Sequence, residues 1–369
     1  MTLMESRGAG ELTAAQTELR ERARRFVEDV LMPREEMAER AGGALPEAEV
    51  DAIRQAAVAA RLNGGLHAPE HGGQGWSHVE WALVEEQLGR STNGLSWHIP
   101  SAYNVLAHGS PEQIDRWLRP GLRGGSQDAY AVTEEHAGSD PSAIATTARR
   151  TDAGWRIDGE KWFVTSGDVA SVYIVVANVV EDGATLPTLF LVERGAPGIE
   201  IVDDPPFTHA YPHGHPTVRF TNVEVPEDAV LGGVGLGDDL QRAWFTEERL
   251  GIAARGLGAM WRLLDESVAW ATTREQGGAR IYDHQGVSFP LADSAADAAA
   301  GRALTLAVCA LADDPAADLK LLHGKASMAK LFVSERAWVC ADRAVQTFGG
   351  RGYLRTNAVS YTHLRAHET

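Results

Sequence analysis

A loop that could bind a ligand through its backbone and hydroxyl groups lies within residues 128–165 of this 369-residue chain. Residues 129–133 are β-prone and lead into the polar run Thr133-Glu134-Glu135, which is followed by Ala-Gly-Ser-Asp at 137–140. Gly138 allows the backbone to turn or to approach a ligand closely, because it has no Cβ. Ser139 and Asp140 are small and polar, and they favour hydrogen-bonded turns.

Strand-like segments follow this loop and would hold it in place. Two pairs of residues, Thr146 with Ala148 and Trp155 with Ile157, alternate with polar neighbours. This alternation is typical of a half-buried strand. Asp158-Gly159 predicts a hairpin turn before the next strand-like run at 161–165. On these residues alone, any β-barrel could carry the pattern.

The rest of the chain divides into helical segments on either side of this β region. Capping-box patterns, Thr13 with Gln16 and Ser77 with Glu80, precede apolar residues at helical spacing. Long amphipathic segments after residue 238 suggest a helical bundle. We therefore expect an α+β multidomain fold: an N-terminal helical domain at 1–128, a middle β-barrel-like domain at 129–237 and a C-terminal helical bundle at 238–357.

Composition excludes several classes of protein. The net charge of −17, from 34 Lys and Arg against 51 Asp and Glu, argues against nucleic acid as a partner, because phosphate binding needs a basic face. Cys309 and Cys340 lack metal-ligand spacing, so we expect two reduced core residues in a cytoplasmic protein. With no apolar run of about eighteen residues and no apolar leader, we expect neither a membrane span nor a secretory signal.

Three histidines, His209, His213 and His215, raise the question of a metal site. His213 and His215 would share one face of a strand, as two metal ligands can. No carboxylate or cysteine completes a ligand set in the sequence. A polar loop near the substrate entrance is therefore the favoured interpretation, and we expect no metal.

Two linked motifs resemble those of the acyl-CoA dehydrogenase family. Residues 132–140 read VTEEHAGSD and residues 159–165 read GEKWFVT, against the family patterns T-E-x-x-A-G-S-D and G-x-K-x-[aromatic]-[aliphatic]-T. The resemblance extends over roughly residues 13–356 and includes QTFGGRGY at 346–353. It implies an FAD-dependent enzyme of fatty acid metabolism. A carboxylate would remove the Cα proton of an acyl-CoA thioester and a hydride would pass from Cβ to flavin N5, giving a trans-2-enoyl-CoA.

The resemblance also implies which residues bind FAD. One set would lie against the flavin ring, the pyrophosphate and the thioester entrance: Tyr130, Val132, Thr133, Gly138, Ser139, Phe163 and Thr165. Ser139 would also contact the substrate. A second set would come from a neighbouring subunit: Arg274, His284, Gln285, Gln346, Gly349 and Gly350. Gly277 replaces the aromatic residue of the family pattern R-x-x-F-G. A site shared in this way predicts a homotetramer or dimer.

The catalytic base is the part of the site that the resemblance determines least. Most family members carry it in a C-terminal Glu-Gly-Thr motif, which this sequence does not show. A minority place it immediately before an arginine on the helix that opens the last domain, where this chain has Glu248-Arg249. The resemblance thus implies Glu248 as base and Arg249 as a substrate-binding residue, with a structural role at a helix start as the alternative. Glu247 is expected to point elsewhere and to be solvated.

Several alternatives stay open. Electrons would pass to an electron-transfer flavoprotein, but a flavin oxidase or monooxygenase could use the same scaffold. Residues 358–369 do not resemble the family, and we expect an artefactual tail in place of the true C-terminus. A catalytically inactive flavin-binding fragment is therefore another possibility. A non-catalytic DNA-associated protein would need a basic C-terminal region, which the acidity counts against. Acyl chain length and branching are not determined.

Overall fold

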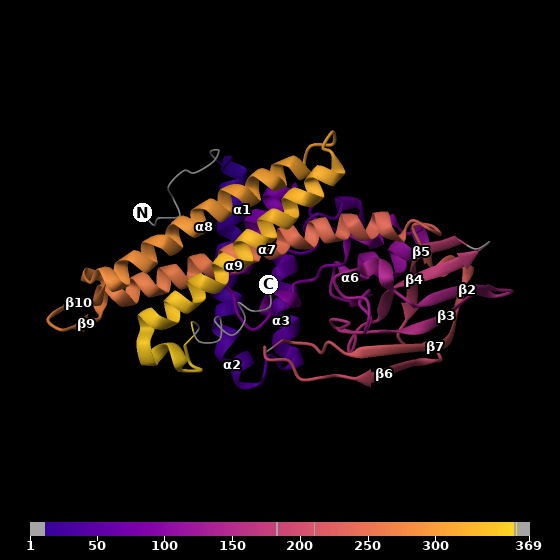
Figure 1. The fold of residues 1–369 in the computed structure, drawn as a ribbon, viewed down its shortest axis with the longest axis horizontal. Coiled ribbons are helices and arrows are strands. Elements are labelled where there is room, and N and C mark those ends of the chain that lie inside the picture. The colour runs from indigo at the N-terminus through magenta and orange to yellow at the C-terminus, as the bar shows by residue number, and fades with distance from the viewer. Residues whose placement is uncertain (1–11, 182–183, 210, 358, 360–369) are drawn as a thin grey trace.

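The computed structural model describes residues 12–181, 184–209, 211–357 and 359, and its elements follow the predicted order (Figure 1). Helices come first, a sheet follows, and three long helices complete the chain. The predicted fold class is confirmed. The tail predicted at 358–369 lies outside the described residues, apart from Val359.

The N-terminal part is helical, as predicted. Its helices are α1 (Ala14–Phe26), α2 (Glu35–Arg40), α3 (Glu47–Ala59), α4 (His78–Leu88), α5 (Pro111–Gln113) and α6 (Arg119–Gly121). Capping boxes begin α1 at Thr13 and α4 at Ser77, as expected from the sequence. Pro33 cannot extend an α-helix, and the chain passes through a π turn and a 3₁₀ turn between α1 and α2.

The middle of the chain forms an eight-stranded sheet. Its strands are β1 (Asp128–Ala131), β2 (Thr147–Thr151), β3 (Gly154–Lys161), β4 (Val172–Glu181), β5 (Ala184–Glu193), β6 (Ile199–Asp203), β7 (Thr217–Pro226) and β8 (Val230–Leu231). The order is β6-β7-β3-β2-β4-β5-β8, and β1 lies parallel to β4. Alternating buried side chains of β3, β4, β5 and β7 fill the core on one side of this sheet.

The hairpin turn predicted at Asp158-Gly159 is wrong. β2 and β3 are joined two residues after Thr151, and β3 continues through Gly159 with a shift of its register against β7. Glycine is needed here because Thr146 packs closely against the backbone of residue 159, and not because the chain turns. A Cβ at Gly159 would lie 2.2 Å from the Thr146 hydroxyl oxygen.

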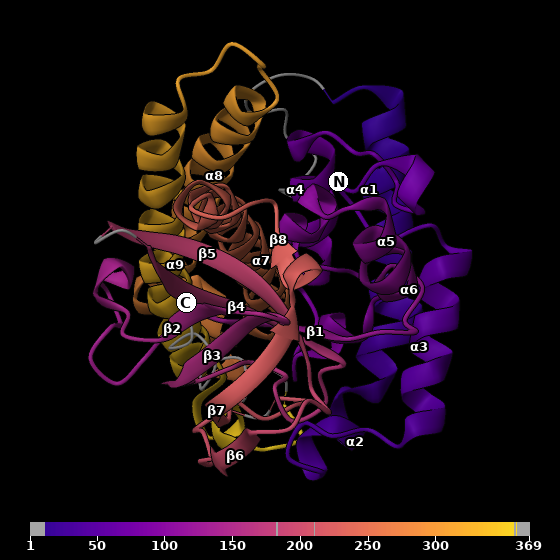
Figure 2. The ribbon, with the colours of Figure 1, turned by 90° about the vertical axis from the view of Figure 1, so that its right-hand side faces the viewer.

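Helix α7 (Gly237–Thr273) is a long central helix that contacts both the N-terminal helices and the bundle. Its 37 residues span about 55 Å at 1.5 Å per residue. It packs against α8 (Gln285–Ala312), α9 (Leu319–Phe348) and α4, and the small hairpin of β9 (Glu275–Gln276) and β10 (Ala279–Arg280) follows its far end. Figure 2 shows the N-terminal helices on one side of α7 and the pair α8 and α9 on the other.

The core of the bundle contains both cysteines, as predicted. Cys309 and Cys340 are buried and unpaired, and burial raises the pKa of the Cys309 thiol to about 12. Helix α8 has a mean hydropathy of 1.4 over its most apolar window, which by length and composition alone would suffice for a membrane span. In the structure, α8 packs against α7 and α9 as part of the bundle. The expectation of no membrane span stays a prediction.

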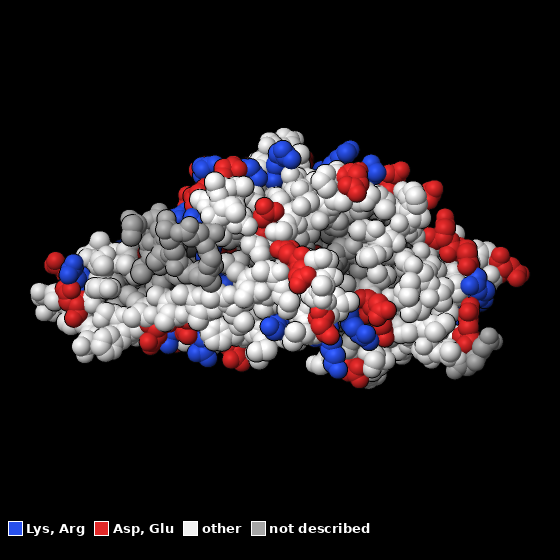
Figure 3. Space-filling model, turned by 90° about the horizontal axis from the view of Figure 1, so that it is seen from above, with Lys and Arg blue, Asp and Glu red and all other residues white. Residues whose placement is uncertain are grey.

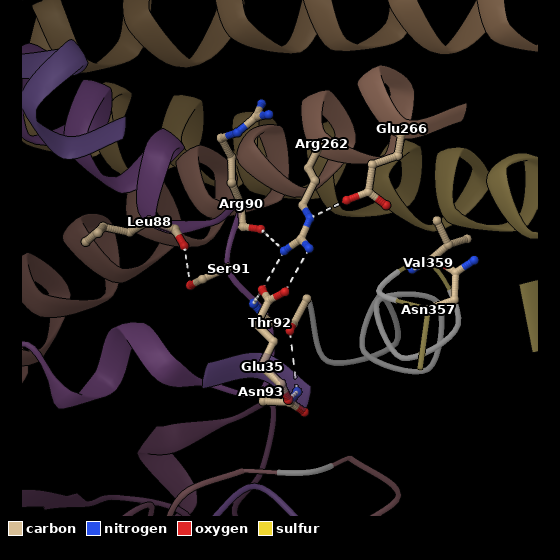
Figure 4. A network of polar contacts seen from close by, with 10 residues as sticks. All are labelled: Glu35, Leu88, Arg90, Ser91, Thr92, Asn93, Arg262, Glu266, Asn357 and Val359. Carbon is tan, nitrogen blue, oxygen red and sulfur yellow. Dashed lines mark hydrogen bonds and ion pairs between the residues drawn. The ribbon is translucent and has the colours of Figure 1, made fainter. Parts of the chain in front are cut away.

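A buried ion pair joins the N-terminal part to α7 (Figure 4). The Arg262 guanidinium on α7 binds both carboxylate oxygens of Glu35, donates to the Arg90 carbonyl at 2.7 Å and donates to Glu266 at 2.7 Å. Glu35 also accepts from the Thr92 amide at 2.8 Å. Since Glu35 is only 4% exposed, its charge depends on Arg262 for compensation.

Replacing Arg262 with methionine is expected to destabilise the protein by about 3–5 kcal/mol, because Glu35 would stay buried without its partner. Urea denaturation measures the loss. Arg40→Met is the matched control, since Arg40 pairs with Glu36 on the exposed surface of α2 and such pairs contribute about 1 kcal/mol or less. Equal losses in the two variants would contradict this account.

Candidate active site

The two sequence motifs are held together by a fully buried lysine. The Lys161 ammonium at the end of β3 donates to Glu134 Oε1 at 2.7 Å and to the Val132 carbonyl at 2.9 Å. Burial lowers the pKa of Lys161 to about 8, against the opposing charge of Glu134. Glu134 also accepts from the amide and the hydroxyl of Thr146. The buried ion pair between Lys161 and Glu134 therefore holds the loop after β1 next to the end of β3.

The first predicted cofactor set gathers around these two segments. Trp162 donates its amide to the Thr133 carbonyl at 2.7 Å, which brings the segments side by side. Phe163 has a positive φ of 55° and leaves 49% of its side chain exposed. Gly138 and Ser139 lie on the exposed loop, and a Cβ at Gly138 would meet no atom within 4 Å.

These observations fit a flat cofactor ring. A bulky residue with positive φ is strained, and such strain is concentrated at functional sites. Here the strain at Phe163 holds a large apolar ring at the surface, where a second ring could cover it. The open space at Gly138 leaves room for close approach.

The Thr165 hydroxyl belongs to a chain of hydrogen bonds. It lies 3.0 Å from His215 Nδ1, and His215 Nε2 lies 3.0 Å from His209 Nε2. His213 instead packs edge-on against His98. The expected strand face is wrong, since these histidines lie in the loop before β7, and the expected polar loop is confirmed. Among the residues that the structure describes, no three His, Cys, Asp or Glu side chains are grouped to hold a metal.

An aromatic cluster connects β1 to α7. Tyr130 stacks on Trp244 with a centroid separation of 4.2 Å and an interplanar angle of 6°. Tyr103 packs edge-on against both rings. Together, these rings make an apolar wall that connects β1 to the start of α7.

A cavity of about 340 Å³ lies behind this wall, between α4, residues 96–103 and α7. Its aromatic lining includes Trp76, Trp81, Trp97, Tyr103 and Trp244. Its titratable lining comprises Arg54, Glu85, Asp128, Glu247, Glu248, Arg255 and the histidines His67, His98 and His213. A chamber with an aromatic wall and several convergent polar groups is typical of a small-molecule site.

Glu248 lines this cavity, as its predicted role requires. Its side chain is 32% exposed and faces Arg255, whose Nη2 lies 3.7 Å from Glu248 Oε2. Arg255 is bound in turn to Glu85 at 2.8 Å. Burial raises the pKa of Glu248, while the charge of Arg255 opposes that rise. The raised pKa makes the ionised form of Glu248 a stronger base than an exposed glutamate, and Arg255 stabilises that ionised form.

The expectation that Glu247 is solvated is wrong. Glu247 also lines the cavity and accepts from Asn104 Nδ2 at 2.9 Å. Burial, followed by the charge of Glu248, raises the pKa of Glu247 to about 8. The reason is that the segment before Asn104 covers this side of α7 too, so two adjacent helix positions face the same chamber. At neutral pH, Glu247 therefore holds its proton, while Arg255 favours the charged form of Glu248.

Glu247→Gln is expected to raise the thermal unfolding temperature more at pH 8 than at pH 5. A carboxyl whose pKa is about 8 when folded, against 4.5 as its ordinary value, loses stability as pH rises through that window, whereas a glutamine does not. Differential scanning calorimetry at the two pH values measures the difference. Glu70→Gln, at an exposed position in the N-terminal part, is the control. A gain that is equal at both pH values would contradict the assignment.

Arg249 does not line the cavity, so the geometry does not support its predicted role in substrate binding. Its guanidinium lies 5.3 Å from the centre of the Phe245 ring and 3.1 Å from His323 Nε2 on α9. Being next to Glu248 in sequence, it points to another side of the helix.

The second predicted cofactor set lies at the opposite end of the bundle. All six of its members are exposed: Arg274, His284, Gln285, Gln346, Gly349 and Gly350. Trp270 connects α7 to α9 there, since it stacks on Phe348. The Arg274 guanidinium lies 5.9 Å from the centre of the Trp270 ring. From Trp244 to Arg274 the helix advances about 45 Å. One cofactor cannot reach both sets in a single chain (Figure 1).

The Gly277 departure from the family pattern has a local cause. Gly277 and Gly278 connect β9 to β10 and have φ values of 63° and 81°. Two consecutive positive φ values are the requirement of a tight hairpin turn, which glycine meets without strain. The turn, and not an aromatic side chain, occupies this position.

Several cavity residues were not found from the sequence: Glu85, His98, Tyr103, Trp244 and Arg255. Only Arg255 had a usable signal, since it follows Glu248 by two helical turns and so lies on the same face of α7. The others belong to segments that no motif connects to the site.

Comparisons with known families cover almost the whole chain. Residues 13–125 match the acyl-CoA dehydrogenase N-terminal domain, residues 129–223 match the middle domain and residues 235–368 match the C-terminal domain.

Individual proteins give the same result. An acyl-CoA dehydrogenase of Bacillus subtilis is 36% identical over 303 residues, covering 79% of this chain and 78% of its own. The (R)-benzylsuccinyl-CoA dehydrogenase of Thauera aromatica is 31% identical over 368 residues, covering 95% and 89%. The CarC subunit of the caffeyl-CoA reductase-Etf complex of Acetobacterium woodii is 28% identical over 298 residues, covering 79% and 78%.

Solved structures share the fold. Butyryl-CoA dehydrogenase from Megasphaera elsdenii superposes with a TM-score of 0.87 at 26% identity, covering 98% of this chain and 94% of its own. The FAD complex of PigA superposes with a TM-score of 0.87 at 26% identity, covering 97% and 94%.

Proposed function

The chain belongs to the acyl-CoA dehydrogenase family, and we propose that it oxidises the acyl group of its substrate in the cavity beside Glu248. It is an oxidoreductase that acts on CH–CH donors and uses FAD. The product would be a trans-2-enoyl-CoA.

FAD, when bound, supplies the acceptor for the hydride that leaves Cβ of the thioester. The motif segments orient it from this chain's side. Phe163 offers an exposed ring, while Thr133 and Thr165 offer polar groups beside it. The Lys161–Glu134 pair keeps these segments at a fixed separation.

Glu248 would take the Cα proton. The observation that carries this proposal is the pair of adjacent carboxyl groups in one cavity, of which Glu247 keeps its proton and Glu248 is opposed by Arg255. A Cα proton is a very weak acid, so its base must be poorly solvated and have a raised pKa. The wall of Tyr103, Tyr130 and Trp244 excludes water from this side of the chamber.

We also propose a homo-oligomer, either a tetramer or a dimer. Helices α8 and α9 present exposed apolar side chains that nothing in the described part of the chain covers: Phe289, Leu321, Met328 and Leu331. Only 28% of the most apolar window of α8 is buried. The surface that the bundle forms also shows long uncharged stretches (Figure 3). A second copy could cover this face and bring its far set, including Arg274, to the cofactor of the first.

Leu331→Glu is expected to dissociate this oligomer, because it places a charge in the covered apolar face. Light scattering coupled to size-exclusion chromatography gives the mass in solution. Val58→Glu, an equally large change at an exposed apolar position of α3, is the control and should leave the mass unchanged. A monomeric starting protein would overturn the proposed assembly.

The partner that reoxidises the protein is proposed to be an electron-transfer flavoprotein, supported by the similarity to a subunit of an Etf complex. Rapid reoxidation by oxygen, with peroxide formed, would favour a flavin oxidase instead. Comparing reoxidation rates with electron-transfer flavoprotein and with oxygen separates the two.

The proposed reaction is tested by adding a panel of acyl-CoA thioesters to the purified protein without oxygen. The expected result is loss of the long-wavelength flavin absorbance with at least one thioester, and a product two hydrogens lighter than its substrate by mass spectrometry. Bound flavin that no thioester reduces would contradict the proposal.

A further inference from the structure

The cavity contains a histidine whose polar atoms have no protein partner. His98 is only 4% exposed and lines the chamber. Neither Nδ1 nor Nε2 of its ring makes a hydrogen bond within the described part of the chain. Its nearest ring neighbour is His213, which packs edge-on at 5.9 Å and leaves both nitrogens unused.

An unpartnered buried imidazole is costly for the free protein. Burial lowers the pKa of His98 to about 4, so near neutral pH its ring is uncharged, with one nitrogen donating and the other accepting. Leaving such a group unsatisfied destabilises the free protein, and a ligand removes that penalty if it supplies a hydrogen-bonding partner.

The surroundings favour a neutral partner over a charged one. Arg54, the cation at this end of the chamber, is already paired with Glu47 at 3.0 Å and with Asp51 at 3.2 Å. Arg255 is similarly bound to Glu85. A carboxylate at the end of the acyl group would therefore find both arginines of the described lining already paired, in a chamber that also holds the carboxyl groups of Glu85, Glu247 and Glu248.

His98 lies in the same chamber as the proposed base. Both His98 and Glu248 line it, and Tyr103, five residues after His98, packs edge-on against Trp244 in the same lining. An acyl group that enters the chamber beside Glu248 therefore shares it with the imidazole.

We infer that the acyl group oxidised here ends, away from its thioester, in a neutral hydroxyl group that hydrogen-bonds to His98. This inference rests on the proposed function of the cavity. A hydroxyl both donates and accepts, so it can satisfy either tautomer of the ring. A methyl end of the same length would leave the imidazole unpaired, and sites built to bind a hydroxyl reject such analogues strongly.

Isothermal titration calorimetry with 3-thiaacyl-CoA esters tests the inference without turnover. Two series of matched length are compared, one ending in a hydroxyl and one in a methyl. At the best-fitting length, the hydroxyl ester is expected to bind at least about tenfold more tightly. His98→Leu should abolish or reverse that preference. His98→Gln, which keeps a donor and an acceptor, should retain most of it. The exposed His108→Leu is the matched control and should change nothing.

The outcomes separate this inference from the function on which it rests. If methyl esters bind as tightly as hydroxyl esters at every length, or if His98→Leu weakens both series equally, the inference is overturned while acyl-CoA binding stands. If no ester of either series binds, both the proposed function and the inference fall.

Discussion

Glu248→Gln is expected to slow reduction of the bound flavin by acyl-CoA about 10²–10⁴-fold, the usual contribution of a positioned general base. The amide cannot accept the Cα proton, yet it fills the same space beside Arg255. Flavin content should be unchanged, since Glu248 lies on α7 and not on the motif segments. Anaerobic stopped-flow absorbance measures the rate.

The pH dependence gives a second check on the same residue. Glu248 must be ionised to act, and burial raises its pKa. The wild-type rate should therefore increase with pH through a range that lies above the ordinary titration of glutamate near 4.5. Glu70→Gln should behave like the wild type. A Glu248→Gln rate within tenfold of the wild type would place the base elsewhere.

Lys161→Met should be the most damaging single change at the cofactor segments. It leaves the Glu134 carboxylate enclosed without its cation, a loss of about 3–5 kcal/mol. Because Lys161 also binds the Val132 carbonyl, the loop after β1 would separate from the end of β3. We expect a lower unfolding temperature and a higher dissociation constant for FAD, measured by calorimetry and by fluorescence titration.

Arg219→Met provides the matched control for that change. Arg219 on β7 pairs with Glu160, the residue before Lys161, but it does so on the exposed surface. Its loss should cost about 1 kcal/mol or less. Glu134→Gln should be milder than Lys161→Met above pH 8, because Lys161 can then release its proton. If Lys161→Met costs no more than Arg219→Met, the pair does not hold the segments together.

The order of helices, sheet and bundle could be predicted because it depends on local patterns. Thr13 and Ser77 begin helices through contacts within four residues, and the strands show their alternation directly. The hairpin turn predicted at Gly159 was wrong because glycine occurs both in tight turns and where another segment packs closely against the backbone. Here Thr146, which lies outside the predicted hairpin, packs against Gly159, and the sequence around Gly159 does not show this contact.

The candidate site was predictable only where a motif marked it. The motif residues from Tyr130 to Thr165 lie together, as expected, because the loop after β1 and the end of β3 are joined by the Trp162 amide and by the Lys161–Glu134 pair. Glu247 was misjudged because helical periodicity describes α7 alone, whereas burial depends on what covers it. His98 and Tyr103 come from a segment with irregular structure, so their place in the cavity follows from tertiary packing alone.

The separation of the two cofactor sets depends on the length of α7, which the motifs do not reveal. The length of α7 places Arg274 about 45 Å from Trp244, which makes sharing between copies the simplest geometry. The resemblance to the family predicts that the second set comes from a neighbouring subunit, and the length of α7 gives the physical reason.

The central claim, that Glu248 removes the Cα proton in this cavity, is tested most directly by isotope exchange. A 3-thiaacyl-CoA has no hydrogen-bearing carbon at the β position, so it can lose and regain only its Cα proton. Incubated in deuterated buffer with the holoenzyme, it is expected to incorporate deuterium at Cα, as followed by NMR, and Glu248→Gln is expected to abolish that incorporation. Exchange that proceeds undiminished in Glu248→Gln would show that another group is the base.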